Sequence, residues 1–452
     1  MTARLLLTAP ASGGGKTTVT CAILQALVDR GERPAAFKCG PDYIDPMFHS
    51  QVIGAKSRNL DLFLMGEGAV LRSLADNSRG CVLALLEGVM GYYDGIGLSA
   101  SASAWDLARA TQTPAVLVLD GRRSALTAAA VAKGMRDFRP DSNIRGVIFN
   151  RVSPMLYPRL KEAVEGETGL TAYGFLPNLP GCALESRHLG LVTAGEVKDL
   201  KEKLQRLAAQ AEESLDLAGL LALARTAPAL EPPAAALPEP VGGRPRIAVA
   251  RDRAFCFYYA DGLALLEQLG AELAEFSPLA DEKLPEGTCG LYLGGGYPEL
   301  FARELSENAP MGAAIRAAVA AGLPTVAECG GFLYLGGLLS DGEGRPWPMA
   351  GALPGAAENT GKLGRFGYVT LEAQRDGLLG PAGAKIPAHE FHYWDSTAPG
   401  ADFRAEKPRS QRSWACGYHT PTLYAGFPHF HFCAVPEAAR DFVAAARRYG
   451  EA

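Results

Sequence analysis

The chain has 452 residues, of which 48% are hydrophobic and 21% are charged, and its formal net charge is −5. These proportions exclude a disordered or fibrous protein and leave room for two or three domains. The acidic balance disfavours DNA or RNA as a partner, and no apolar run approaches the ~20 residues that cross a bilayer. Nine scattered cysteines without metal-binding spacing fit a reducing compartment, so we expect a cytoplasmic protein.

Strand-like and helical segments alternate through the first half of the chain. Short apolar runs predict buried strands at residues 5–8, 35–38, 82–86, 115–119 and 146–149. Helical periodicity lies between them, at residues 16–30, 69–77, 104–110 and 124–138. Continuous apolar strands that alternate with helices are typical of a parallel sheet covered on both faces. We therefore expect an α/β fold built on a parallel sheet.

A segment rich in proline and alanine separates this half from a second α/β pattern. It follows an amphipathic helical stretch at 198–224 and carries no apolar period, which predicts an extended linker. We therefore divide the chain into a first domain at 1–226, a linker at 227–245 and a second α/β domain at 246–452. In the second domain we expect strands at 247–250, 290–293, 325–327, 368–371 and 389–393, and helices at 262–269, 311–321 and 437–448.

A glycine-rich loop follows the first predicted strand. It contains Gly13, Gly14, Gly15, Lys16, Thr17 and Thr18. Glycines let backbone N–H groups turn toward phosphates, a lysine neutralises the phosphates, and a threonine at a helix start can ligate Mg²⁺. We interpret the loop as an ATP site with Thr17 as a metal ligand. Pro10 stands where the full pattern has its first glycine, so the match is partial, and a plain glycine turn is the alternative.

Acidic and amide side chains follow two further predicted strands. Glu87 comes directly after the run at 82–86, the place of a metal-facing or water-ordering acid, and Asp94 lies in the glycine-rich segment beyond it. A surface loop with two solvated acids is the alternative. Asn150 follows the run at 146–149 and could contact adenine, although an ordinary turn asparagine fits equally well.

Another polar segment closes the strand predicted at 35–38. It offers Lys38, Asp42 and Asp45 at the carboxyl edge of the sheet, where ligands bind in open α/β folds. We expect these side chains to contact the substrate or its metal. A turn with helix-capping aspartates is the alternative.

A cysteine lies between a short strand and an apolar helix in the second domain. Cys329 precedes Gly330, and such a strand–nucleophile–helix turn exposes the sulfur and directs helix-start N–H groups at it. The Gly330 N–H, with the backbone of Gly295 and Gly296 after another strand, would bind the oxyanion of a tetrahedral intermediate. A buried structural cysteine is the alternative.

Two histidines near the C-terminus are candidate partners of this thiol. His429 and His431 are two residues apart, so on a strand their side chains would point the same way. Either could deprotonate Cys329 and then protonate the leaving ammonia. The sequence leaves open which of the two is the base.

These motifs together resemble the cobyrinic acid a,c-diamide synthase family, including its hydrogenobyrinic acid branch. The first half of the chain is similar to dethiobiotin synthetase, and the second is similar to a triad-type (class I) glutamine amidotransferase domain. The resemblance spans nearly the whole chain and rests on residues 11–18, 38–46, 48–49, 87–95, 185–191, 294–299, 328–335 and 429–432.

The resemblance implies a ligase that uses ATP, Mg²⁺ and L-glutamine. Glutamine would be hydrolysed at Cys329, ATP would phosphorylate first the c- and then the a-acetate carboxylate of hydrogenobyrinic or cobyrinic acid, and ammonia would displace each phosphate. The resemblance also implies that Asp42, Glu87 and Asp94 support metal and acyl-phosphate chemistry, and that Tyr43 and Ile44 contact the substrate.

The chain departs from ordinary triad amidotransferases after the histidine. Those enzymes carry Pro-Glu there, whereas this chain has Phe430 and His431, so the acid that orients the base is absent or comes from elsewhere.

Three other functions stay open. Cobyric acid synthase shares both domain types but lacks the segment at 41–46. A P-loop switch ATPase of the chromosome-partitioning kind carries a second lysine early in its loop, where this chain has Ala11 and Ser12. A glutaminase-like sensor would have a vestigial thiol domain. A homodimer is compatible with the sequence, which does not fix whether the preferred ring contains cobalt.

Overall fold

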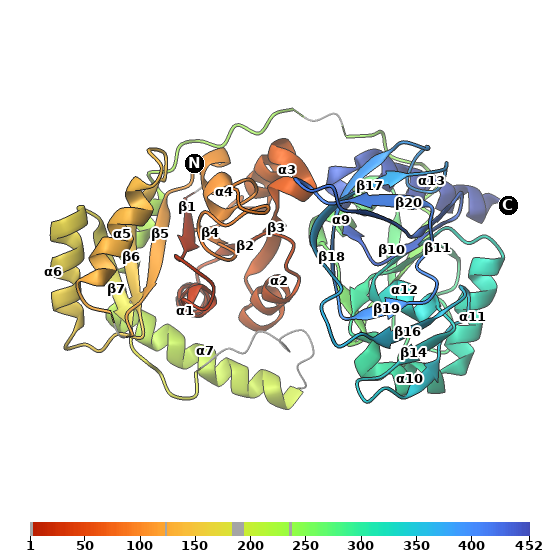
Figure 1. The fold of residues 1–452 in the computed structure, drawn as a ribbon, viewed down its shortest axis with the longest axis horizontal. Helices are drawn as coiled ribbons and strands as arrows, with labels where there is room; N and C mark the ends of the chain where they lie inside the picture. The colour runs from red at the N-terminus through yellow and green to blue at the C-terminus, as the bar shows by residue number, and fades with distance from the viewer. Residues whose placement is uncertain (1–2, 123, 183–193, 235–236) are drawn as a thin grey trace. The chain divides into compact units, whose positions relative to one another are not determined.

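The computed structural model describes residues 3–122, 124–182, 194–234 and 237–452, so the motif at 185–191 lies outside the described residues. The chain separates into two compact units, Met1–Ala234 and Ala235–Ala452 (Figure 1). Both units combine helices with a largely parallel sheet, which confirms the predicted fold class.

A seven-stranded parallel sheet forms the centre of the first unit. In spatial order its strands are β3 (Lys56–Leu60), β2 (Ala35–Cys39), β4 (Ala84–Glu87), β1 (Arg4–Thr8), β5 (Ala115–Asp120), β6 (Ile144–Asn150) and β7 (Thr171–Leu176). From the central strand β1 the chain forms β2 and β3 on one side, returns with β4 between β2 and β1, and continues with β5 to β7 on the other side. The strand order therefore reverses beside β1, which is where open α/β sheets bind ligands.

Helices cover both faces of this sheet. They are α1 (Lys16–Asp29), α2 (Ile44–Phe48), the π-helical η1 (His49–Ile53), α3 (Leu62–Asn77), α4 (Ala104–Ala110), α5 (Thr127–Asp137), α6 (Tyr157–Thr168), α7 (Ala194–Ser214) and α8 (Leu217–Ala224). Helices α1 and α7 pack against each other along one face (Figure 1). Their buried side chains share one apolar core with the central strands.

Several elements of the first unit, including α2 and η1, escape the sequence patterns. Strands β3 and β7 were not predicted, because both are edge strands and lack a continuous apolar run: β3 reads Lys-Ser-Arg-Asn-Leu, and β7 contains Gly174. Helix α6 was also missed. The single helix predicted at 198–224 is broken between α7 and α8, where Leu215 pairs with Gly174 and the Asp216 side chain caps α8 through the Gly219 N–H at 2.8 Å.

The predicted linker carries no helix or strand among its described residues. Its first part is attached to the first unit, because Arg4 Nη1 donates to the Pro228 carbonyl at 2.7 Å and Arg72 Nη1 donates to the Pro233 carbonyl at 3.0 Å. These bonds explain why the first compact unit extends to Ala234 rather than ending at the predicted residue 226. At the other end, the Val241 N–H donates to the Leu269 carbonyl at 2.7 Å within the second unit.

The second unit is built on a six-stranded sheet with the order β10 (Glu272–Phe276), β8 (Arg246–Ala250), β11 (Thr288–Leu293), β13 (Thr325–Glu328), β23 (Leu423–Gly426) and β22 (Tyr418–Thr420). All neighbours are parallel except the edge strand β22. An antiparallel sheet has the order β21 (Ser413–Cys416), β20 (Phe403–Glu406), β17 (Arg365–Ala373), β18 (Lys385–His392) and β24 (His429–Phe430).

Smaller elements complete the second unit. A four-stranded sheet contains β15 (Pro346–Pro348), β14 (Leu338–Ser340), β16 (Ala356–Asn359) and β19 (Trp394–Ser396), and β12 (Gly295–Gly296) pairs with β9 (Phe255–Phe257). The helices are α9 (Ala260–Gln268), the 3-10 helix η3 (Pro298–Phe301), α10 (Ala302–Glu307), α11 (Ala309–Ala320), α12 (Gly330–Leu335), the 3-10 helix η4 (Phe432–Ala434) and α13 (Pro436–Glu451).

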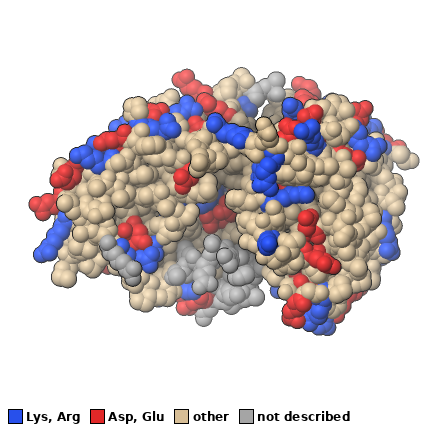
Figure 2. Space-filling model, in the orientation of Figure 1, with Lys and Arg blue, Asp and Glu red and all other residues tan. Residues whose placement is uncertain are grey.

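The surface carries charges of both signs. On the face drawn in Figure 2, Lys and Arg side chains and Asp and Glu side chains occur on both units. Among the described residues, no helix has the length and the apolar character that crossing a membrane requires.

Candidate active site

The glycine-rich loop joins β1 to α1 and depends on left-handed backbone at two positions. Gly13 has φ 78° and Gly15, the N-cap of α1, has φ 95°. A Cβ on Gly15 would lie 1.8 Å from Asn150 Nδ2, and Asn150 itself donates to the Gly14 carbonyl at 3.2 Å. Glycine is therefore required at position 15 both by conformation and by space.

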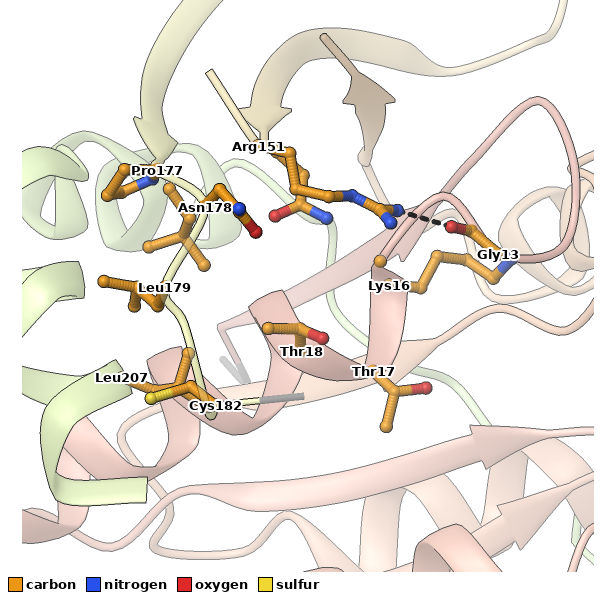
Figure 3. A pocket seen from close by; sticks show the side chains of 13 residues that line it. Gly13, Lys16, Thr17, Thr18, Arg151, Pro177, Asn178, Leu179, Cys182 and Leu207 are labelled. Carbon is orange, nitrogen blue, oxygen red and sulfur yellow. Dashed lines mark hydrogen bonds between the residues drawn. The ribbon is translucent and has the colours of Figure 1, made fainter. Parts of the chain in front are cut away.

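A cavity of about 400 Å³ opens over this loop (Figure 3). Of the residues predicted to bind a nucleotide, six line it: Gly13, Gly15, Lys16, Thr17, Thr18 and Asn150. Gly14 lies in the loop but is not among the lining residues. The far side is formed by Asn178 and Leu179, which follow β7, and Arg151 donates to the Gly13 carbonyl at 2.6 Å. The sequence patterns missed Arg151, Asn178 and Leu179.

Lys16 points into the phosphate loop. Its Nζ donates to the Met90 carbonyl at 2.5 Å and to the Ala11 carbonyl at 3.3 Å. Burial, followed by repulsion from Lys38, lowers the pKa of Lys16 to about 8, although nearby carboxylates including Asp94 oppose the change. Asp94 is fixed by accepting the Gly91 N–H at 2.9 Å. The Lys16 ammonium group therefore has a pKa close to neutral pH.

The carboxyl ends of β2 and β4 bring a buried charge cluster together. Lys38 Nζ lies 2.5 Å from Asp45 Oδ2 and 2.9 Å from Glu87 Oε1, and the same Glu87 oxygen accepts the Thr17 hydroxyl at 2.5 Å. Burial lowers the pKa of Lys38, but Glu87 and Asp45 outweigh it and hold that pKa well above its usual value. Burial raises the pKa of Asp45, but Lys38 leads the effects that bring the net pKa below its usual value.

The predicted substrate residues lie beside this cluster. Asp42 accepts the Ile44 N–H at 2.8 Å, and burial together with the neighbouring Asp45 raises the pKa of Asp42 to about 7. Tyr43 is buried and Ile44 begins α2, half-buried. Asn59, on the unpredicted strand β3, donates to the Asp42 carbonyl at 2.6 Å and so supports this turn.

His49 is a residue of the cluster that the site prediction did not include. It is fully buried, and its Nε2 lies 3.5 Å from Glu87 Oε2. Burial lowers the pKa of His49, so its ring is neutral at physiological pH. Its position in the segment at 48–49 was the signal available in the sequence.

Cys329 occupies a sharp turn in the second unit. It follows β13 (Thr325–Glu328), is the N-cap of α12 and has φ 45° and ψ −99°, a positive-φ conformation that is rare for a residue with a side chain. Its N–H donates to the Gly426 carbonyl on β23 at 2.7 Å. The strained turn matches the predicted nucleophile elbow.

The predicted oxyanion residues meet beside this turn. A Cβ on Gly330 would lie 3.0 Å from the Gly296 nitrogen and 3.4 Å from the Gly295 carbonyl carbon. A Cβ on Gly295 would lie 2.4 Å from His429 Cε1. The three glycines therefore let the two backbone segments and the imidazole approach one another closely.

His429 lies on β24, in hydrogen-bonding contact with Cys329. Burial lowers the pKa of His429, but attraction to Cys329, together with Glu328, outweighs burial and raises the pKa to about 10. The ring of His389, on β18, stacks on His429 with centroids 5.0 Å apart, and Tyr259 Oη lies 2.9 Å from His389 Nε2. Sequence reasoning missed Glu328, His389 and Tyr259.

His431 has a different environment from the one predicted. Strand β24 ends at Phe430, so His431 does not continue the strand beside His429. It is instead the N-cap of η4, its Nδ1 accepts the Cys433 N–H at 3.1 Å, and its ring stacks on Tyr259. Burial lowers its pKa to about 4. The structure thus brings His429, rather than His431, to the thiol.

Comparison with known proteins covers both units. Residues 5–191 match the "CobQ/CobB/MinD/ParA nucleotide binding domain", and residues 246–435 match the "CobB/CobQ-like glutamine amidotransferase domain". The prediction of a nucleotide-binding half and an amidotransferase half is confirmed.

Similar proteins named "Cobyrinate a,c-diamide synthase" match the chain along its length. The protein from Listeria innocua is 38% identical over 98% of this chain and 100% of its own, and the protein from Salmonella typhimurium is 38% identical over 98% of each chain. The protein from Gloeobacter violaceus is 43% identical over 97% of this chain and 96% of its own. The chain therefore belongs to the cobyrinate a,c-diamide synthase family.

Proposed function

We propose that the chain is an ATP- and glutamine-dependent ligase that converts the a- and c-acetate carboxylates of cobyrinic or hydrogenobyrinic acid into amides. The observation that carries this proposal is the match of relatives with that activity in their names across both units, at 38% to 43% identity. The reaction needs a phosphoryl donor and a nitrogen donor, and each unit offers a site suited to one of them.

The second unit is the proposed source of ammonia. Cys329 attacks the glutamine side-chain amide, His429 transfers the proton to the leaving ammonia, and water then hydrolyses the thioester. The Gly330 and Gly296 N–H groups are the proposed oxyanion donors. The contact of His429 with Cys329, and the raised pKa of His429, support His429 as the group that takes the proton of the thiol.

The first unit is the proposed synthetase. The cavity over the glycine-rich loop has the size of a nucleotide site, with Lys16 at the phosphate end and Asn150 and Asn178 available to an adenine ring. ATP transfers its terminal phosphoryl group to the carboxylate of the corrinoid, and ammonia then displaces phosphate. Phosphorylation is required because the oxygen of a free carboxylate is too poor a leaving group for ammonia to displace.

Mg²⁺ fits the residues at the start of α1. Glu87 is fully buried, and within the described part of the chain its Oε2 makes no hydrogen bond; the neutral His49 beside it supplies no charge. Thr17 Oγ1 and Glu87 would hold the ion, with nucleotide phosphates and water as further ligands. The bound metal would neutralise charge on the phosphates during transfer.

Two variants separate the two sites. Cys329→Ala should abolish glutamine-dependent amidation and leave ammonia-dependent amidation intact, whereas Lys16→Ala should abolish both amidations and leave glutaminase activity. The assay contains ATP, Mg²⁺, glutamine or ammonia, and cobyrinic or hydrogenobyrinic acid, with mass spectrometry of the corrinoid. Two carboxyl-to-amide conversions are expected. Conversion of other carboxylates, or no ATP-dependent conversion of either corrinoid, would refute the proposal.

A further inference from the structure

The position two residues after His429 lacks the acid that orients the catalytic histidine in ordinary triad amidotransferases. Ordinary triad amidotransferases carry it two residues beyond the histidine, where this chain has His431. His431 cannot act as that acid, because its side chain is an imidazole that accepts a backbone hydrogen bond from Cys433. A carboxylate nevertheless lies near the base, on the residue directly before the nucleophile.

Glu328 is that carboxylate. It is the last residue of β13 and its side chain is 1% exposed. Its Oε2 lies 3.8 Å from His429 Nδ1, within the range of an ion pair and longer than a direct hydrogen bond. The imidazole and the carboxylate are therefore close enough for the charge of one to stabilise the charge of the other.

Two further contacts fix the carboxylate at this place. Glu328 Oε1 accepts the N–H of Phe430, the residue after His429, at 3.1 Å, and Oε2 accepts the Tyr292 hydroxyl on β11 at 3.2 Å. The bond to Phe430 ties Glu328 to the same short strand that carries the base. These two hydrogen bonds fix the Glu328 side chain in one position relative to His429, and its carboxyl oxygens contact protein groups instead of bulk water.

We propose that Glu328 is the third member of the catalytic triad, a positioning residue supplied from the nucleophile strand instead of from the strand of the histidine. It holds the Nδ1 side of His429, so that Nε2 faces Cys329, and it stabilises the imidazolium formed when the thiol loses its proton. This inference rests on the proposed hydrolysis of glutamine at Cys329. No net chemistry is added, because the proton moves only between Cys329, His429 and ammonia.

Other groups that face the Glu328–His429 pair come from several elements. They are Cys329 on the turn, His389 on β18, Tyr292 on β11 and Tyr424 on β23. Burial and the neighbouring His429 hold the pKa of His389 well below its usual value, and burial with Glu328 raises that of both tyrosines. These shifts favour the neutral forms of His389, Tyr292 and Tyr424, so Glu328 is the acidic side chain among these neighbours that can stabilise the imidazolium.

The test is Glu328→Gln in the full chain. The amide oxygen can still accept the Phe430 N–H, and the amide NH2 can donate to the Tyr292 hydroxyl oxygen in place of Oε2, while the charge is lost. We expect kcat for glutamine hydrolysis to fall at least about 100-fold, KM for glutamine to stay within about threefold, and ammonia-dependent amidation to be unchanged. Alkylation of Cys329 by iodoacetamide at pH 7 should slow by a similar factor, and Glu328→Asp should recover part of the activity.

Glu390→Gln is the matched control. Glu390 is a fully buried carboxylate on β18 of the same unit, paired at 3.7 Å with His392 rather than with His429. The glutaminase activity of the Glu390→Gln variant should stay within about threefold of that of the unchanged protein. Tyr292→Phe removes one anchor and retains the charge, so it should lower kcat less than Glu328→Gln does.

Two results would overturn the inference. Glutaminase activity of Glu328→Gln within threefold of the unchanged protein would show that the charge does not act on His429. Loss of ammonia-dependent amidation and of the folded second unit, in both Glu328→Gln and Tyr292→Phe, would assign Glu328 a purely structural role. Failure of the proposed hydrolysis of glutamine at Cys329 is distinguishable, because the unchanged protein would then lack glutaminase activity or Cys329→Ala would retain it.

Discussion

Thr17, at the start of α1, donates a hydrogen bond of 2.5 Å to Glu87, at the end of β4. The same carboxylate oxygen lies 2.9 Å from Lys38 at the end of β2. The glycine-rich loop, the proposed metal-facing acid and the proposed substrate segment are thus joined through one oxygen atom. A substitution in any one of these three segments should therefore alter the side-chain positions and pKa values in the other two.

Removal of the buried cation gives the first prediction. Lys38→Met leaves Asp45 and Glu87 without their shared counter-charge, which should destabilise the first unit by about 3–5 kcal/mol and abolish ATP-dependent amidation. Hydrogen exchange of β1, β2 and β4 in the full chain measures the effect. The control is Arg79→Met, since Arg79 and Asp76 are paired at the surface with 79% and 55% of their side chains exposed. It should change stability by less than about 1 kcal/mol.

The pKa of Lys16, about 8, gives a second prediction. ATP binds the ammonium form, so binding above pH 8 has to return a proton to Nζ, and affinity should weaken by up to about tenfold per pH unit there. Below pH 8 the group is already charged and binding should take up no proton at this site. Calorimetric titrations with ATP at about pH 9, in two buffers of different ionisation enthalpy, measure the uptake. Equal apparent enthalpies in both buffers would contradict the prediction, and exposed Lys56→Met should behave like the unchanged protein.

The third prediction concerns the close packing of the nucleophile turn. A Cβ on Gly331 would lie 2.2 Å from the Leu293 carbonyl oxygen, so Gly331→Ala should displace α12, lower glutaminase activity at least tenfold and destabilise the second unit by about 1–3 kcal/mol. Ammonia-dependent amidation should persist. Gly342→Ala is the control, because a Cβ there meets no atom within 4 Å. Normal glutaminase kinetics of Gly331→Ala would show that the turn tolerates displacement.

The choice of base gives the fourth prediction. His429→Asn removes the imidazole that contacts Cys329, and both glutaminase activity and alkylation of Cys329 at pH 7 should fall at least about 100-fold. In His431→Asn the side-chain oxygen can still accept from the Cys433 N–H, as Nδ1 does now, so activity should stay within about threefold. The opposite ranking of the two variants would make His431 the base.

The residues that sequence patterns located are those that follow well-marked strands. Lys38, Glu87 and Cys329 each lie at or directly after the end of a strand inside a sheet, and Lys16 begins the helix that follows β1 and the glycine-rich loop. The carboxyl ends of parallel strands lie at one edge of their sheet. That geometry let the chemistry of each site be predicted from residue type and place.

Other site residues lack such a signal. Asn178 follows the edge strand β7, whose glycine and polar residues interrupt the apolar pattern that would identify a strand. The far wall of the cavity, which includes Asn178, was therefore not predicted. Glu328 was visible beside Cys329, but its approach to His429 depends on the pairing of β24 with β18 and on the bond to Phe430. Contacts between residues about 100 positions apart are decided by tertiary packing, which no local pattern contains.

The left-handed backbone of Cys329 has a consequence for how the second unit is maintained. A non-glycine residue with φ 45° and ψ −99° costs about 1–3 kcal/mol of backbone strain. The packing of the fully buried helix α12, which follows Cys329, has to offset this strain. Glycine at this position would relax the turn while deleting the sulfur. Stability of the second unit therefore favours glycine at position 329, whereas the proposed glutaminase activity requires cysteine. The cysteine found there means that the proposed activity is retained at the cost of some stability.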